Sequence, residues 1–187
     1  MRVIGGEFKR RHFNIPKNFK ARPTTDFAKE NLFNVLNNLI DFNSAIALDL
    51  FSGTGSISLE LISRGCSQVI SVEKNPIHHA FIRKTMEEIK TNRCVTIKGD
   101  AFKYIKKSTL QFDLIFADPP YQIYELPLLP ELIFSQQILK PDGIFILEHG
   151  EKDIFTDNMH LFQMRIYGSV HFSFFRAKGK ADAEQIR

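Results

Sequence analysis

The chain has 187 residues, which suits one domain with at most a small appendage, and its 43% of hydrophobic and 25% of charged residues allow an ordinary packed core. No apolar run approaches the roughly eighteen residues of a membrane span, and the basic N-terminus lacks the apolar stretch of a secretory signal. The two cysteines, Cys66 and Cys94, suggest neither a disulfide framework nor a zinc site. We therefore expect a cytoplasmic protein with no membrane partner and no metal.

The net charge of +4 is concentrated in residues 1–23. Seven basic residues there face one acidic residue, a net charge of +6, which leaves about −2 for the remainder of the chain. Such a segment suits a polyanion such as nucleic acid, although a solubilising tail has the same composition. The aromatic rings between the cations could stack on bases or could hold the segment against the body. We predict a basic N-terminal arm over residues 1–23, with candidate nucleic-acid contacts at Arg2, Lys9, Arg10, Arg11 and Arg22.

The first expected elements are a short β-hairpin and a helix. Residues 2–15 place β-forming side chains on both sides of Gly5 and Gly6, a pattern that predicts a strand pair. The stretch 22-RPTTD-26 then supplies N-capping residues. Apolar side chains recur at helical spacing up to Ile40, which predicts an amphipathic helix of about 15 residues.

Strand-like and helix-like runs alternate through the middle of the chain. Strands are predicted at residues 45–51, 68–73, 94–99, 112–117 and 144–149, the last of them after a turn at 141–143. Helices are predicted at residues 56–64, after Pro76, after Gly99 and at 129–139. The helix after Pro76 is expected to bury Ile77, Phe81, Ile82, Thr85 and Ile89. Apolar strands separated by helices imply an α/β fold with a mostly parallel sheet covered on both faces.

The last part of the chain has a different pattern. Residues 161–168 and 169–176 read as two strands joined through Tyr167, Gly168 and Ser169, and so short a connection requires an antiparallel pair. We assign residues 24–176 to the main domain and residues 177–187 to a flexible tail.

A glycine loop follows the first strand of this pattern. Gly53 and Gly55 in 48-LDLFSGTGSIS-58 allow a tight turn into a helix, but Ser58 occupies the place of the third glycine of a dinucleotide fingerprint. Glu73 ends the next strand 18 residues after Gly55, where an acid can bind both hydroxyls of a ribose. Asp49 is expected either to anchor the loop or to meet a cationic group of the ligand.

Two further acids end later strands, Asp100 and Asp118. Together with Asp49 and Glu73 they place four carboxylates where the strand ends line a ligand crevice, with no basic residue at those four positions. That charge disfavours a pyrophosphate and suits a cofactor that is uncharged or cationic. S-adenosylmethionine, which carries a sulfonium, an ammonium, a ribose and an adenine, fits this requirement.

The stretch 118-DPPY-121 indicates the chemistry. An exocyclic amine of a base is a poor nucleophile, because its lone pair is delocalised into the ring. The Asp118 carboxylate and the Pro119 carbonyl, held by the rigid Pro119–Pro120 pair, can accept its two protons and free the lone pair. Tyr121 offers a ring on which a flipped base can stack. We predict methyl transfer to such an amine, with Asp118, Pro119, Pro120 and Tyr121 at the active site.

These motifs resemble known proteins. The combination of 49-DLFSGTG-55 and 118-DPPY-121 resembles the class I amino-methyltransferases, whose Rossmann-like seven-stranded sheet has its last strand inserted antiparallel. More narrowly, the 16S ribosomal RNA guanine-N2 methyltransferases have stretches similar to 1-MRVIGG-6, 22-RPTTD-26, 32-LFNVL-36 and 166-IYGSV-170. The similarity extends from Met1 to about Arg176. One departure is Arg10, since the family usually has glycine at this position.

The resemblance implies a substrate, cofactor contacts and a partner. The substrate would be the N2 amine of a guanine in 16S rRNA, either naked or in the assembling small ribosomal subunit, with the arm contacting the RNA. The implied S-adenosylmethionine contacts are Asp49, Phe51, Gly53, Gly55, Glu73, Asp100 and Ala101.

Three alternatives remain open from the sequence. A DNA adenine-N6 methyltransferase shares the 118-DPPY-121 chemistry, but the chain is short of a DNA-reading domain. An NAD-dependent oxidoreductase would require a small residue at Ser58 and a separate substrate domain. A non-catalytic RNA-binding module would not need an intact active-site motif.

Overall fold

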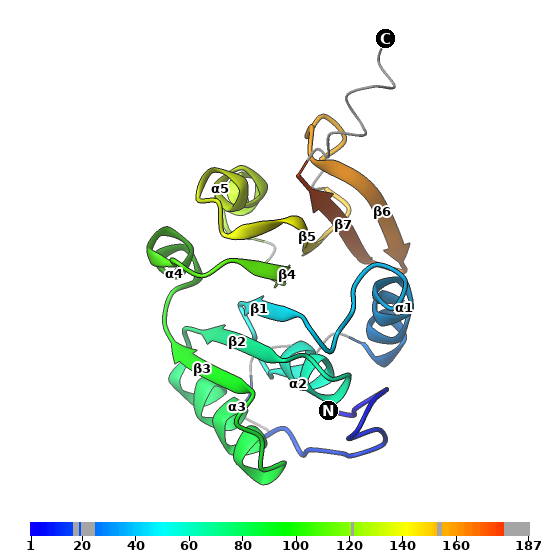
Figure 1. The fold of residues 1–187 in the computed structure, drawn as a ribbon, viewed down its shortest axis with the longest axis vertical. Helices are drawn as coiled ribbons and strands as arrows, with labels where there is room; N and C mark the ends of the chain where they lie inside the picture. The colour runs from blue at the N-terminus through cyan, green and yellow to red at the C-terminus, as the bar shows by residue number, and fades with distance from the viewer. Residues whose placement is uncertain (17–18, 20–24, 121, 153–154, 178–187) are drawn as a thin grey trace.

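The computed structural model describes residues 1–16, 19, 25–120, 122–152 and 155–177. Its centre is one seven-stranded sheet with the order β3-β2-β1-β4-β5-β7-β6 (Figure 1). The strands are β1 (Ile46–Leu50), β2 (Gln68–Glu73), β3 (Cys94–Lys98), β4 (Phe112–Ala117), β5 (Leu139–His149), β6 (Leu161–Tyr167) and β7 (Val170–Arg176). Strands β1 to β5 pair in parallel, whereas β7 pairs antiparallel with both β5 and β6. The predicted α/β class and the antiparallel terminal hairpin are therefore confirmed.

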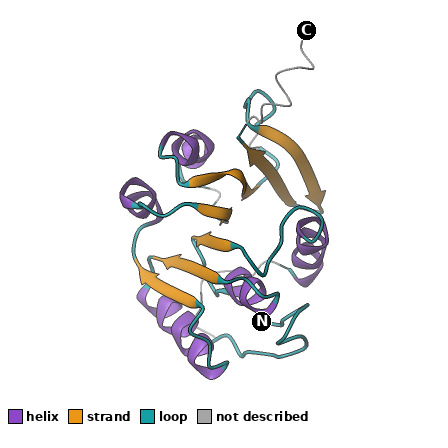
Figure 2. Ribbon diagram, in the orientation of Figure 1, coloured by secondary structure: helices purple, strands orange, loops and turns teal. Residues whose placement is uncertain are grey.

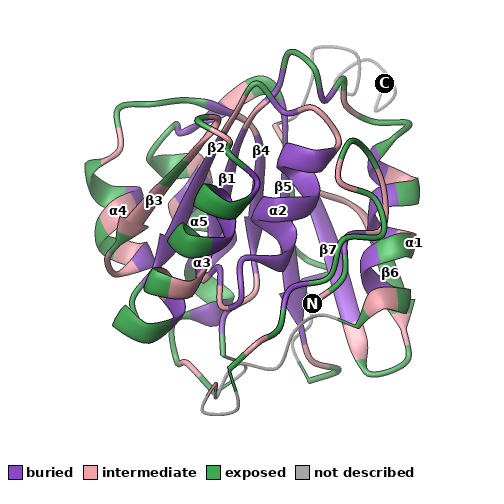
Figure 3. Ribbon diagram, turned by 90° about the horizontal axis from the view of Figure 1, so that it is seen from below, coloured by how far each residue is buried: buried purple, intermediate pink, exposed green. Residues whose placement is uncertain are grey.

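Helices cover both faces of the sheet, as the three layers in Figure 2 show. They are α1 (Asp26–Leu36), α2 (Ser56–Ser63), α3 (Pro76–Glu88), α4 (Ala101–Lys107), the 3-10 helix η1 (Leu126–Leu128) and α5 (Leu129–Ser135). Helices α1, α2 and α3 pack with Ala47, Leu114 and Phe116 in one core. Helices α4 and α5 pack with Leu48 and Ile115 in the other. Successive strand residues thus point to opposite cores, and the central strands are buried on both faces (Figure 3).

Several element boundaries differ from the sequence prediction. The N-terminal hairpin exists as a single antiparallel bridge between Arg2 and His12 rather than as two strands. Helix α1 has 11 residues instead of about 15, and α5 ends at Ser135. Strand β5 begins at Leu139, and the predicted turn appears as a register shift in its pairing with β4. The shift lets the chain turn without leaving the sheet.

The buried face of α3 also differs from the prediction, since Phe81 is only partly buried and Met86 is buried as well. Ile77, which was predicted to be buried, is 49% exposed. The face that packs on the sheet contains His78, Ile82, Thr85 and Met86, and Ile77 lies to one side of it because successive helical residues are about 100° apart. The predicted helix start at Pro76 is confirmed, and the Asn75 side chain caps the helix by accepting hydrogen bonds from the Ile77 and His78 amides.

The described part of the basic arm packs against α2. The buried Glu60 carboxylate accepts hydrogen bonds from the Ile4 and Gly5 amides, both at 2.8 Å, and from the Arg64 guanidinium at 2.9 Å. Val3 and Phe13 are buried in the core that α1 and α2 share. Residues 1–13 are therefore held against the body by backbone hydrogen bonds and apolar contacts.

Lys29 of α1 completes this polar centre. Its ammonium donates to the Arg2 carbonyl at 2.6 Å and to the Ser56 hydroxyl at 2.9 Å, and lies 4.0 Å from the Glu60 carboxylate. Burial lowers the pKa of Lys29, and the negative charge of Glu60 opposes that shift. Two buried charges are tolerated here because each has several hydrogen-bond partners or an opposite charge nearby.

We predict that Glu60→Ala destabilises the fold by about 3–5 kcal/mol, because it leaves the Ile4 and Gly5 amides without their acceptor and the buried Lys29 without its opposite charge. Glu87→Ala is the matched control, since it breaks the exposed Arg83–Glu87 pair and is expected to cost about 0.5 kcal/mol or less. Denaturant unfolding measures both free energies. Equal costs for the two variants would show that Glu60 does not stabilise the fold in this way.

Candidate functional site

The carboxyl ends of β1, β2 and β4 open onto one cavity of about 780 Å³. It lies where the strand order reverses between β1 and β4, the position at which ligands bind in open α/β sheets. The sequence-predicted residues that line it are Asp49, Phe51, Gly53, Glu73, Asp100, Ala101, Asp118, Pro119 and Pro120. Gly55 is not among the lining residues, and Tyr121 lies outside the described residues.

The loop between β1 and α2 turns through backbone conformations that favour glycine. Gly53 has φ 53° and Gly55 has φ 71°. A Cβ on Gly55 would lie 2.8 Å from Cγ1 of Ile82, so this glycine allows α2 and α3 to pack closely. Phe51 has φ 58° without being glycine, a strained conformation of the kind found at ligand sites. The loop therefore brings backbone, rather than side chains, to the cavity at Gly53.

Asp49 anchors this loop to the helix that follows. Its buried carboxylate accepts hydrogen bonds from the backbone amide of Ser58, at 3.0 Å, and from the Ser58 hydroxyl. The serine at the third-glycine position thus contributes to the anchor. Burial raises the pKa of Asp49 to about 7, although the hydrogen bonds from Ser58 oppose this shift. Of the two predicted roles for Asp49, the structure shows the anchor.

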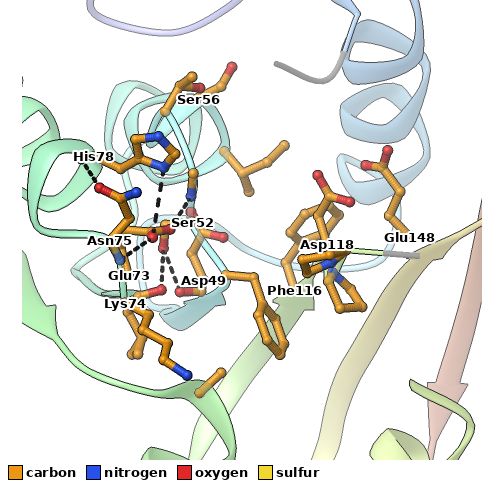
Figure 4. Close-up of a pocket in the computed structure, with 18 of the residues that line it drawn as sticks. Asp49, Ser52, Ser56, Glu73, Lys74, Asn75, His78, Phe116, Asp118 and Glu148 are labelled. Atoms are coloured by element: carbon orange, nitrogen blue, oxygen red, sulfur yellow. Dashed lines mark hydrogen bonds and ion pairs between the residues drawn. The ribbon is translucent and has the colours of Figure 1, made fainter. Parts of the chain in front are cut away.

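Glu73 is held in a fixed orientation at the end of β2. One carboxylate oxygen accepts from the Gly53 amide at 2.8 Å, and the other accepts from the Asn75 amide at 2.7 Å. His78 of α3 places Nδ1 3.8 Å from the second oxygen, and its ring stacks on Phe19. Because each carboxylate oxygen has two lone pairs, Glu73 retains acceptor capacity towards the cavity (Figure 4).

Asp100 caps α4 and carries a cationic neighbour. Its carboxylate accepts from the Lys103 amide at 3.2 Å and from the Lys74 ammonium at 3.1 Å. Although partial burial raises the pKa of Asp100, the hydrogen bonds from Lys103 and Lys74 outweigh it and lower the pKa overall. The sequence prediction concerned only the four acidic positions, and the structure adds a basic residue beside them, since Lys74 also lines the cavity.

Asp118 and Glu148 lie side by side on the far wall of the cavity. Glu148, which the sequence analysis missed, follows the apolar run of β5 as Asp118 follows that of β4. Figure 4 shows both side chains, away from Glu73. Burial raises the pKa of Asp118 well above its usual range, and the negative charges of Glu148 and Asp49 raise it further. The same rule that selected the other four acids, an acid at a strand end, would have found Glu148.

Two of the arm residues that are predicted to contact nucleic acid form ion pairs with acidic residues of this chain. Arg2 pairs with Asp26 at 2.9 Å, and Arg11 lies 3.7 Å from Glu88. Lys9 and Arg10 are exposed. Arg10 has φ 71°, the backbone conformation that favours the glycine usual in the resembling family. Arg22 lies outside the described residues.

Three further lining residues belong to the stretches 22-RPTTD-26 and 166-IYGSV-170, which resemble the 16S rRNA methyltransferases but were not predicted to line the ligand cavity. Thr25 precedes α1, and Ser169 and Val170 belong to the β6–β7 connection and β7. Beside them Phe27, 65% exposed, contacts the Tyr167 ring edge-on at 6.1 Å between centroids. These stretches alone do not predict a place at the cavity, because the packing of α1 against the terminal hairpin brings the residues there.

The described residues contain no cluster of three or more His, Cys, Asp or Glu side chains that could hold a metal ion. No helix formed by the described residues is long and apolar enough to cross a membrane.

The sheet order, the antiparallel β7 and the acid-lined cavity at the strand ends define a Rossmann-like methyltransferase of class I. Among solved structures, yhhF from Escherichia coli shares the fold, with a TM-score of 0.83, 24% identity, and coverage of 95% of this chain and 99% of that one. The methyltransferase SMU.776, solved in complex with SAH, has a TM-score of 0.61 at 16% identity and covers 77% of this chain and 48% of that one.

The chain belongs to the family described as Conserved hypothetical protein 95, whose model matches residues 1–176. YlbH of Bacillus subtilis (strain 168) is 32% identical over 156 residues, which cover 81% of this chain and 84% of that protein. The Ribosomal RNA small subunit methyltransferase D of Escherichia coli (strain K12) is 27% identical, over 98% of this chain and 94% of that protein.

The raised pKa of Asp49 predicts a pH-dependent stability. Between its ordinary value of 3.8 and about 7, the folded state keeps a proton that the unfolded state releases, so this contribution to stability falls as the pH rises. Asp49→Asn removes the titration. The free energy of unfolding of this variant, relative to that of the wild type, should therefore rise by about 1 kcal/mol per pH unit from about pH 5 to pH 7.

Asp100→Asn is the control for this measurement. Because the pKa of Asp100 is lowered, its contribution is fully present above its unfolded value and is lost only at lower pH. Urea unfolding at about pH 5, 6 and 7 should give a constant difference between this variant and the wild type. A constant difference for Asp49→Asn as well would mean that Asp49 does not titrate in this range.

Proposed function

We propose that the protein transfers a methyl group from S-adenosylmethionine to the exocyclic N2 amine of a guanine in 16S rRNA. One observation carries the proposal. The same cavity contains Asp118 of the 118-DPPY-121 motif and, across the cavity, Glu73, an acid at the position that binds the ribose of a nucleoside cofactor. The relatives named Ribosomal RNA small subunit methyltransferase D support ribosomal RNA of the small subunit as the substrate.

The residues around Glu73 fit a nucleoside cofactor. Glu73 can accept hydrogen bonds from two ribose hydroxyls, because the Gly53 and Asn75 amides already fix its orientation. The side chains of Val72, Ala101 and Phe102 supply apolar surface for an adenine. No phosphate has to be accommodated beside these acids. SMU.776, which shares the fold, was solved with SAH, and this supports S-adenosylmethionine as the cofactor.

The other side of the cavity suits the amine. When bound, the cofactor supplies a methyl group on a positively charged sulfur. The Asp118 carboxylate and the Pro119 carbonyl accept the two N–H protons of the guanine amine and direct its lone pair to that carbon. The nitrogen–carbon bond forms as the carbon–sulfur bond breaks, and the sulfur keeps the electron pair. The amine then loses one proton, which Asp118 is placed to accept. Pro119 is buried, so its carbonyl acts in a site with little water.

The direct test uses small ribosomal subunits and naked 16S rRNA from a strain that lacks the protein, incubated with labelled cofactor. Nucleoside mass spectrometry identifies the product. We expect N2-methylguanosine at one position. N6-methyladenosine, or label appearing only in DNA, would overturn the proposed substrate while leaving the methyltransferase class intact.

Two isosteric substitutions should separate binding from chemistry. Asp118→Asn is expected to lower the methyl-transfer rate by roughly a hundredfold or more while leaving the Kd for S-adenosylmethionine within about twofold. Glu73→Gln is expected to raise that Kd by roughly tenfold, because charge-assisted hydrogen bonds are lost, and to retain most of the rate at saturating cofactor. Calorimetric titration and single-turnover assays measure the two quantities. A loss of cofactor binding in Asp118→Asn would show that Asp118 is structural.

The exposed cations of the arm are proposed to contact RNA phosphates. The double variant Lys9→Gln and Arg10→Gln should weaken rRNA binding roughly tenfold and flatten the slope of log K against log salt concentration by about 1.5, because two counterion-releasing contacts are removed. The control replaces two exposed lysines of α4, Lys106→Gln and Lys107→Gln, on the opposite face of the sheet from the arm. Equal effects of the two double variants would show only non-specific attraction.

A further inference from the structure

The register of the sheet places Glu148 on the same wall of the cavity as Asp118. Strands β4 and β5 pair in parallel with Ala117 opposite Leu147, so Asp118 and Glu148 are the next residues on neighbouring strands. Ala117 and Leu147 both face the core beneath α4 and α5. Because side chains alternate along a strand, Asp118 and Glu148 both point to the other face, about 5 Å apart in the sheet direction. Figure 4 shows their carboxylates directed to the same side.

The environment of Glu148 suits contact with a ligand. Its side chain is 4% exposed yet lines the cavity, so the carboxylate reaches ligand space in a site with little water. Because Asp118 and Glu148 both line the cavity and point to the same side, a ligand with two adjacent N–H donors can meet both carboxylates.

Among the bases, guanine presents such an edge. Its N1–H and its N2 amine are neighbouring donors, and both point in the same direction. Adenine offers an amine beside an unprotonated N1, whose lone pair would face a carboxylate. The N2 amine of guanine is the nucleophile in the function proposed above, and Asp118 is the acceptor assigned to it. The adjacent donor, N1–H, would then lie towards β5.

We propose that Glu148 accepts the N1–H of the target guanine while Asp118 accepts from its N2 amine, so that Glu148 selects guanine. This inference rests on the proposed guanine-N2 activity and assigns its base specificity to one residue. Selection operates in both directions, since guanine gains a charge-assisted hydrogen bond and a base with a bare N1 meets a repulsive lone pair. Sites that bind a substrate N–H in this way reject analogues that lack it by large factors.

The test uses 2-aminopurine, which keeps the exocyclic N2 amine but has no proton on N1. Small-subunit rRNA is ligated from fragments so that the modified position carries either guanine or 2-aminopurine, and single-turnover methyl transfer is measured on both. The wild type should prefer guanine by roughly a hundredfold or more. Glu148→Gln should reduce this preference at least about tenfold, because its amide can donate to a bare N1 and binds N1–H without charge.

Glu125→Gln is the matched control, since Glu125 also lines the cavity but lies on the segment before η1. It should keep the wild-type preference. The Kd of Glu148→Gln for S-adenosylmethionine should also remain within about twofold of the wild type, which separates a specificity effect from a collapse of the site.

The outcomes distinguish this inference from the function on which it rests. A wild-type product other than N2-methylguanosine overturns both. A wild type that methylates guanine N2, together with a Glu148→Gln variant that keeps the full preference against 2-aminopurine, overturns the role of Glu148 alone. An equal loss of preference in Glu125→Gln also overturns it, because the effect would then not depend on the position beside Asp118.

Discussion

The site depends on one constraint of the fold, the burial of carboxylates at the ends of parallel strands. Parallel strands end at the same edge of a sheet, so acids far apart in sequence, such as Asp49, Asp118 and Glu148, meet around one cavity. The loss of water raises the pKa values of Asp49 and Asp118, and the negative charges of Glu148 and Asp49 raise the pKa of Asp118 further. The neighbours of each acid determine its protonation state or the hydrogen-bond donors that it meets.

On the other side of α2, a buried carboxylate stabilises the fold itself. Glu60 is buried and accepts backbone amides of the first residues, and Lys29 supplies the opposite charge. Residues 1–13 are thereby fixed beside the body of the protein. If their exposed cations contact RNA, they do so from a defined position, which lowers the entropy lost on binding.

Much of the site could be predicted because strand ends are visible in the sequence. Asp49, Glu73, Asp100 and Asp118 each follow an apolar run, and the structure brings all four to one cavity. The helical pattern around residue 77 was less informative, since a long apolar side chain near a helix start can lie off the buried face. Lys74 was missed because the position after a strand end shows nothing about where a flexible side chain will pair.

The sequence by itself determined the α/β class, the order of the elements, the glycine turn and the acids at the strand ends, because these follow from local periodicity and backbone preference. Only the tertiary structure decided which residues share the cavity with them. Thr25 and Val170 reach it through the packing of α1 and β7, and the β4–β5 register sets Glu148 beside Asp118. Such contacts depend on how segments that are distant in the sequence pack together, and no local sequence pattern encodes that packing.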